Sequence, residues 1–153
     1  MSFFNNFDSD VVIHQGIAPA TQGSLNTGWI APFVNDGANR AVFLLDVGTL
    51  GAGVTIDMKL EQATDSSGTG AKDITGAVIT QVTDTTDERV RTIEIAPNAL
   101  DDINGYTYVR AVVTVAGGTG TAPYGVLALS RQLREPGNTT SGSDWDEAVF
   151  VTG

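Results

Sequence analysis

A strict alternation of apolar and polar residues over positions 54–61 constrains this chain more than any other feature of its sequence. Apolar side chains stand at every second position of Val54-Thr-Ile-Asp-Met-Lys-Leu-Glu61, and the side chains between them are polar. Successive side chains of a strand point to opposite faces of a sheet, so the pattern predicts a strand with one buried and one solvated face. Such strands are typical of an antiparallel sheet that covers a single core.

Other segments carry strand patterns separated by short, turn-rich breaks. The segment Arg40–Val47 is apolar on both faces, as expected of a central sandwich strand. Further strands are expected over 74–82, 90–96, 106–116 and 124–131, with one helical turn over 98–105. The 18 glycines and 5 prolines favour many short strands over long helices. We therefore expect an all-β protein, an antiparallel β-sandwich of about eight strands.

The two ends of the chain differ in composition from its middle. Residues 1–35 are irregular and are predicted to form an N-terminal arm with one or two short strands. Residues 36–131 carry the strand patterns and are predicted to form the β-sandwich core. Residues 132–153 begin with a polar stretch of linker composition and end in an apolar patch, so a C-terminal arm is expected there.

Charge and composition exclude several classes of partner. The formal net charge is -10 and the sequence pI is about 4.2, which disfavours binding to phosphate backbones, so no nucleic acid partner is expected. No apolar run approaches the roughly 18 residues of a membrane span, and no membrane partner is expected. The N-terminus lacks the basic start of a secretion signal, which predicts a protein made in a cytoplasm.

Residues suited to catalysis or metal binding are few. His14 is the only histidine and the chain has no cysteine, so neither a histidine pair nor a thiolate site can form. Calcium loops that start at Asp65 or Asp101 would place Gly76 or Val112 where a bidentate glutamate is required, which favours ordinary turns. We expect no catalytic residues, no cofactor, no metal and no enzymatic activity.

Aromatic residues in the body of the chain admit two interpretations. Trp29, Trp145, Tyr106, Tyr108 and Tyr124 could form a platform on which sugars stack. Alternatively, Tyr106 and Tyr108 cover the solvent side of one sheet or its contact with a neighbouring subunit, since aromatic residues are enriched in both settings. The second interpretation is favoured. The candidate partner-contact residues of this group are Trp29, Tyr106, Tyr108 and Trp145.

Apolar residues also gather at both ends of the chain. Large apolar side chains are seldom left in water by a soluble monomer, so these clusters are expected to fold back on the sandwich or to contact another chain. The terminal candidates for partner contact are Phe3, Phe4, Phe7, Val149, Phe150 and Val151.

The stretch Lys59-Leu-Glu-Gln-Ala-Thr-Asp-Ser-Ser-Gly-Thr-Gly-Ala-Lys-Asp-Ile-Thr-Gly-Ala77, followed by Tyr106-Thr-Tyr-Val-Arg-Ala-Val-Val-Thr-Val115, resembles the head decoration, or cement, proteins of tailed bacteriophages. The resemblance covers about residues 40–130 and consists of a pleated strand, an Asp/Gly/Thr loop and an Asp-Ile-Thr-Gly opening of the next strand. It implies a β-sandwich, often jelly-roll-like, that binds the outside of a mature capsid. The family has no catalytic residues to carry over.

The leading hypothesis is therefore a structural virion protein on the outer capsid surface that stabilises contacts between capsomers. Its partners would be the major capsid protein and further copies of itself, as a dimer or trimer. The alternatives are a virion-displayed glycan-binding or adhesin-like module and a structural protein of the tail or baseplate.

Overall fold

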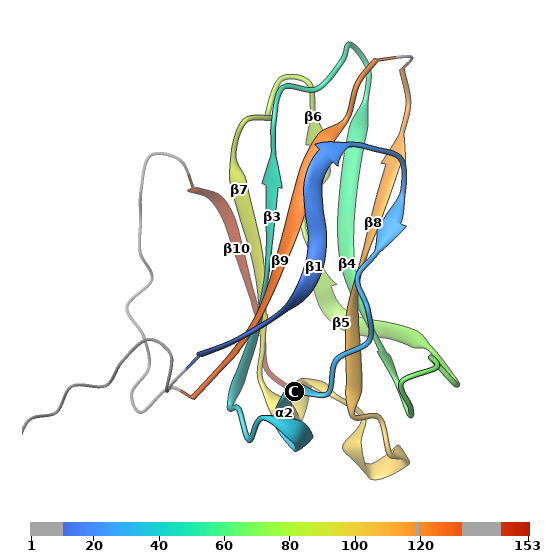
Figure 1. The fold of residues 1–153 in the computed structure, drawn as a ribbon, viewed down its shortest axis with the longest axis vertical. Helices are drawn as coiled ribbons and strands as arrows, with labels where there is room; N and C mark the ends of the chain where they lie inside the picture. The colour runs from blue at the N-terminus through green and yellow to red at the C-terminus, as the bar shows by residue number, and fades with distance from the viewer. Residues whose placement is uncertain (1–10, 119, 133–144) are drawn as a thin grey trace, which may run out of the picture.

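The computed structural model describes residues 11–118, 120–132 and 145–153, which form two β-sheets packed face to face (Figure 1). The strands are β1 (Val11–Thr21), β2 (Leu25–Asn26), β3 (Arg40–Val47), β4 (Thr55–Ala63), β5 (Lys72–Val78), β6 (Val82–Thr83), β7 (Val90–Ile95), β8 (Tyr108–Ala116), β9 (Pro123–Arg131) and β10 (Trp145–Val151). Helical structure is limited to α2 (Pro32–Asn35) and two 3-10 turns, η1 (Pro97–Ala99) and η2 (Asp102–Asn104). The expected all-β sandwich is confirmed, and η1 and η2 lie where a helical turn was predicted.

The strands follow a jelly-roll plan. The first sheet has the order β1-β9-β3-β7-β10, and the second has the order β2-β8-β4-β5, with β6 also pairing with β4. Early strands pair with late ones in nested fashion: β1 with β9, β2 with β8, β3 with β7, and β4 with β5, all antiparallel. This nesting of eight strands in two sheets is the jelly-roll topology that the resemblance implied.

One strand departs from the predicted antiparallel arrangement. β10 lies beyond the eight-stranded plan and runs parallel to β7, with Val149 opposite Ile93. Both β7 and β9 are antiparallel to β3, so they point the same way. β10 is parallel to β7 and therefore runs in the same direction as β9. Residues 133–144, which join the two strands in sequence, lie outside the described residues.

Residues that the sequence placed in the two arms form strands of the sandwich. β1 has 11 residues, pairs with β9 and buries Ile17 in the core. Its pairing has register irregularities on both sides of Ile17, near Gly16 and Pro19. These interruptions break the alternation by which a strand is recognised in sequence, so a long strand was missed there. Residues 145–151, assigned to the C-terminal arm, form β10.

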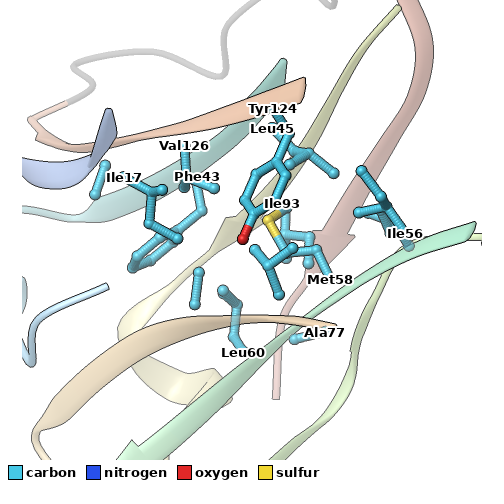
Figure 2. Packing of buried hydrophobic residues seen from close by; sticks show 14 of the residues in the cluster. Ile17, Phe43, Leu45, Ile56, Met58, Leu60, Ala77, Ile93, Tyr124 and Val126 are labelled. Atoms are coloured by element: carbon cyan, nitrogen blue, oxygen red, sulfur yellow. The ribbon is translucent and has the colours of Figure 1, made fainter. Parts of the chain in front are cut away.

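The core lies between the sheets and is built from their inward faces. Val54, Ile56, Met58 and Leu60 are all 2% exposed or less, which confirms the buried face predicted from alternation. Figure 2 shows Phe43 and other inward side chains of the first sheet meeting those of the second. Each large aliphatic or aromatic side chain buried in this way contributes roughly 1.5–3 kcal/mol relative to leaving it in water. The two outer faces are thus the surfaces on which function can be sought.

Candidate functional site

The outer face of the second sheet is charged, and most of its charges are paired within the chain, while Asp57 accepts a hydrogen bond from the neutral amide of Gln81. Arg110 of β8 donates two hydrogen bonds to Oε2 of Glu61 on β4, at 3.0 and 2.8 Å. Its guanidinium lies 4.5 Å from the centroid of the Trp29 ring. Lys59 bridges Asp73 at 2.6 Å and Glu61 at 3.4 Å, and the hydrogen bond to Asp73 raises the pKa of the Lys59 ammonium. Both cations of this face, Lys59 and Arg110, are thus already paired with carboxylates of the same chain.

The loop between β4 and β5 is tied to the same face. Lys72 lies 2.5 Å from Oδ2 of Asp101 and 4.0 Å from the centroid of the Tyr106 ring. The hydrogen bond between Lys72 and Asp101 lowers the pKa of Asp101 and raises the pKa of Lys72. The Tyr106 hydroxyl donates to the carbonyl of Gly70 at 3.1 Å.

Asp65, considered above as the start of a calcium loop, acts as a turn residue. Its Oδ1 accepts hydrogen bonds from the backbone N–H groups of Ser67 at 2.8 Å and Thr69 at 3.0 Å. Hydrogen bonding, led by the Thr69 side chain, lowers the pKa of Asp65. A carboxylate that bonds the backbone two residues on is the usual device of such turns.

The outer face of the first sheet is apolar at its centre. Strand register aligns its outward side chains in two rows that cross the sheet. The first row is Ile13, Leu129, Val42, Glu94 and Phe150; the second is Leu127, Leu44, Thr92 and Ala148. Ile13 is 62% exposed, Phe150 53% and Leu127 39%, while Val42, Leu44 and Leu129 are half-buried. We call this surface the apolar face.

Charged groups border the apolar face at its two ends. Arg40 and Arg131 both bind Glu94, at 3.2 and 3.0 Å, and Arg40 also lies 5.1 Å from the centroid of the Phe150 ring. At the other end of β3 stands Asp46, which is exposed and makes no side-chain hydrogen bond or ion pair with any described residue. The outward side of β3 is therefore positive at one end and negative at the other.

A groove deepens the apolar face beside β1. It has a volume of about 490 Å³, and its lining includes Ile17, Pro19, Leu44 and Leu127, with Asp46 as the one charged residue. Gln15 is the other residue of the lining with a polar side chain. Its shape and composition suit apolar contact with another protein surface.

His14 belongs to a separate polar cluster between the sheet and the loop after α2. Its Nε2 lies 2.9 Å from Oγ of Ser130 and 3.0 Å from Oδ2 of Asp36, and the Ser130 hydroxyl donates to the same Asp36 oxygen at 2.7 Å. A catalytic triad needs the serine and the carboxylate on different ring nitrogens. Here both face one nitrogen, and Ser130 is only 1% exposed. The geometry is that of a structural hydrogen-bond cluster that joins β1 to β9 and to the loop after α2.

The predicted contact residues fall into different surroundings. Trp29 and Tyr106 are half-buried and covered by Arg110 and Lys72, and Tyr108 is half-buried at the start of β8. Val149 and Val151 pack against the core, whereas Phe150 points outward, because successive residues of a strand face opposite sides. The backbone of Trp145 pairs with Val90 in β10. Phe3, Phe4 and Phe7 lie outside the described residues.

The apolar face was not among the candidate sites expected from the sequence. Arg40–Val47 was predicted to be a central sandwich strand, which it is, but its apolar outward side was not interpreted as an exposed surface. The available signal was that apolar pattern together with the outward pair Leu127 and Leu129 on the opposite side of β9 from Val126 and Ala128.

Two other kinds of site are not found in the part of the chain that the structure describes. No group of three or more histidine, cysteine or acidic side chains is placed to hold a metal ion within the described ranges. No helix in the described part of the chain has the length and apolar character needed to cross a membrane. Comparisons with protein-family models, curated proteins and solved structures find no match for this chain.

Proposed function

We propose that this protein is a structural virion component that binds the outside of a phage capsid and stabilises contacts between neighbouring capsomers. The observation that carries the proposal is the pairing of Val11 with Arg131. Residue 10 joins the body at this corner of the sandwich, next to the apolar face, and residue 133 follows β9 there, whereas residue 144 leads into Trp145 beside Val90. Phe3 is eight residues from Val11, so the aromatic side chains can act up to about 26 Å from the corner.

A rigid body with an apolar contact segment, residues 1–10, at one corner suits a clamp between capsomers. Many copies of a small protein spread over capsid joints add contact area that expansion of the shell must break. The major capsid protein is the proposed partner, and the outer capsid surface is the proposed location of a protein made in the host cytoplasm. The jelly-roll fold is compatible with this role but does not by itself specify a function.

A glycan-binding or adhesin-like role ranks second. It would use the aromatic rings of Trp29 and Tyr106, and both rings already contact a cation of the same chain. A sugar would have to displace Arg110 or Lys72 to stack on those faces. A structural role in a tail or baseplate uses the same kind of contact and differs only in where the protein lies in the virion.

Immunogold labelling of intact virions that carry the protein tests its location. The proposal predicts gold particles on filled heads; labelling confined to tails would overturn it. Purified heads stripped of the protein are then incubated with the full chain. The combined substitutions Phe3→Ser, Phe4→Ser and Phe7→Ser should abolish rebinding without changing the melting temperature. A matched variant, Tyr106→Ala with Tyr108→Ala, should still bind heads, whereas a glycan-binding role predicts that it loses its ligand.

A further inference from the structure

The outward side of β3 carries a simple polar–apolar–polar pattern. Arg40, Val42, Leu44 and Asp46 occupy successive outward positions, so one strand has a cation at its start, two aliphatic side chains in its middle and a carboxylate at its end. This pattern is complementary to itself when the strand is turned end for end.

The neighbouring strands strengthen the charge difference. Arg131 joins Arg40 at the start of β3, and the two guanidinium groups share one carboxylate, Glu94. That end therefore retains one positive charge. At the opposite end Asp46 retains its negative charge, since no described cation pairs with it. Between them lie the two rows of the apolar face.

We infer that a second copy of this chain docks on the apolar face to form a two-fold symmetric dimer. A two-fold axis between the copies that crosses β3 at right angles, between Val42 and Leu44, superimposes apolar centre on apolar centre. It also brings Asp46 of each copy to the Arg40 and Arg131 end of the other. A two-fold axis along the strands would instead place like charges together, which costs free energy. Charge thus selects one of the two face-to-face arrangements.

The size of the face sets the strength expected of this dimer. Five strands spaced by about 4.8 Å and seven residues of about 3.3 Å each give a projected area of roughly 550 Å² per copy. Stable interfaces bury about 800 Å² per partner, so this one lies at the small end. The dimer should therefore dissociate at concentrations on the order of micromolar rather than nanomolar. This inference goes beyond capsid binding and does not depend on it.

Sedimentation velocity of the full chain across a concentration series tests the dimer. The expected result is a monomer–dimer equilibrium that Leu127→Asp weakens at least about tenfold, because a carboxylate would be buried at the centre of the interface. Thr114→Asp is the matched control: Thr114 is exposed on the outer side of the other sheet, and its substitution should leave the equilibrium unchanged.

A charge-swap experiment tests the orientation. Asp46→Arg and Arg131→Glu should each weaken self-association. In a two-fold symmetric dimer, each substitution places like charges opposite one another at both copies of the contact between position 46 and the Arg40 and Arg131 end. An equimolar mixture of the two variants should restore a dimer of one copy of each, in which both contacts pair opposite charges. Melting temperatures of each variant show whether it is folded.

Several results would overturn the inference. A wild-type chain that stays monomeric up to high concentration would overturn it. This holds also if the reason is that residues 1–10 cover the apolar face of their own copy. A dimer equally sensitive to Leu127→Asp and Thr114→Asp, or a mixture that fails to restore association when both variants are folded, would do so as well. If Arg131→Glu does not fold, Asp46→Arg and Leu127→Asp decide between the outcomes. Loss of head binding with self-association intact would contradict only the proposed function.

Discussion

Arg110 lies over the ring of Trp29 while it holds Glu61 through two hydrogen bonds. One guanidinium thus connects the segment before α2 to the outer face of β4 and β8. The arrangement uses an aromatic ring that the sequence alone made a candidate for sugar stacking. It also provides a spectroscopic probe of this face.

Replacing Arg110 with alanine should expose Trp29 and lower the stability of the fold. In a Trp145→Phe background, the fluorescence maximum of Trp29 should shift to longer wavelength because the ring gains contact with water. The loss of the stacked cation and its ion pair should cost about 1 kcal/mol in chemical unfolding. Val112→Ala, on the same side of β8, is the control for an unspecific loss of packing. An unchanged emission spectrum in Arg110→Ala would contradict the stacking.

The core predicts a large contrast between two apolar positions. Phe43 is fully buried, and Phe43→Ala should lower the free energy of unfolding by about 3–5 kcal/mol through lost burial and the cavity left behind. Ile103 is 93% exposed, and Ile103→Ala should change it by less than about 0.5 kcal/mol. Urea unfolding followed by circular dichroism measures both. Similar losses for the two variants would show that the chain does not bury Phe43.

Gly16 allows β1 to approach β9. A side-chain Cβ at this position would overlap the backbone carbonyl of Val126, which cannot move without breaking the pairing of the two strands. Gly16→Ala should therefore destabilise the protein by more than about 2 kcal/mol and speed hydrogen exchange along β1. A Cβ at Gly28 would meet no atom within 4 Å, and the backbone there is not left-handed, so Gly28→Ala should be tolerated. Equal exchange rates in the two variants would contradict the close approach.

Tyr124 makes stability depend on alkaline pH. Burial raises the pKa of its hydroxyl, which donates a 2.6 Å hydrogen bond to the carbonyl of Gly23. In the unfolded chain the hydroxyl ionises near its ordinary pKa of about 10, while in the folded protein it stays protonated to higher pH. The contribution of the protonated Tyr124 hydroxyl to the free energy of unfolding is therefore fully present below pH about 10. It is lost as the pH rises toward the pKa of Tyr124 in the folded protein.

Unfolding free energies measured from neutral to strongly alkaline pH check this sign. Tyr124→Phe should be less stable at neutral pH, because the Gly23 carbonyl loses its partner, but its decline above pH about 10 should be shallower than that of the wild type. Parallel declines for the two proteins would assign the alkaline sensitivity to other groups.

Local patterns predicted the strands better than they predicted the surfaces. The bounds of β3 match the expected segment Arg40–Val47, and the buried face of β4 follows from alternation alone. Only short strands were predicted where the 11-residue β1 lies, because Gly16 and Pro19 interrupt its pattern, and Gly76 with its left-handed backbone lies in a β5 shorter than the expected strand. In each case a turn-forming residue lies inside a strand that tertiary pairing maintains.

The apolar face could not be predicted because it depends on strand order. Alternation shows which side chains of the same strand share a face with Ile13, Leu127 or Val42. It does not show which strands lie side by side. His14 and Ser130, adjacent in the sheet, are 116 residues apart in sequence. The same holds for the apolar face, whose members come from β1, β3, β9 and β10.

The position of β9 between β1 and β3 determines when this protein can fold. In the described residues β1 pairs only with β9, so β1 waits for a strand that is synthesised much later before it gains a partner. β3 likewise lacks one neighbour until Pro123–Arg131 has been synthesised. Pairings so distant in sequence close slowly, and unpaired strands are prone to associate with other chains. The first sheet therefore forms only after Pro123–Arg131 has been made, and rapid production at high temperature should favour aggregates over the native sandwich.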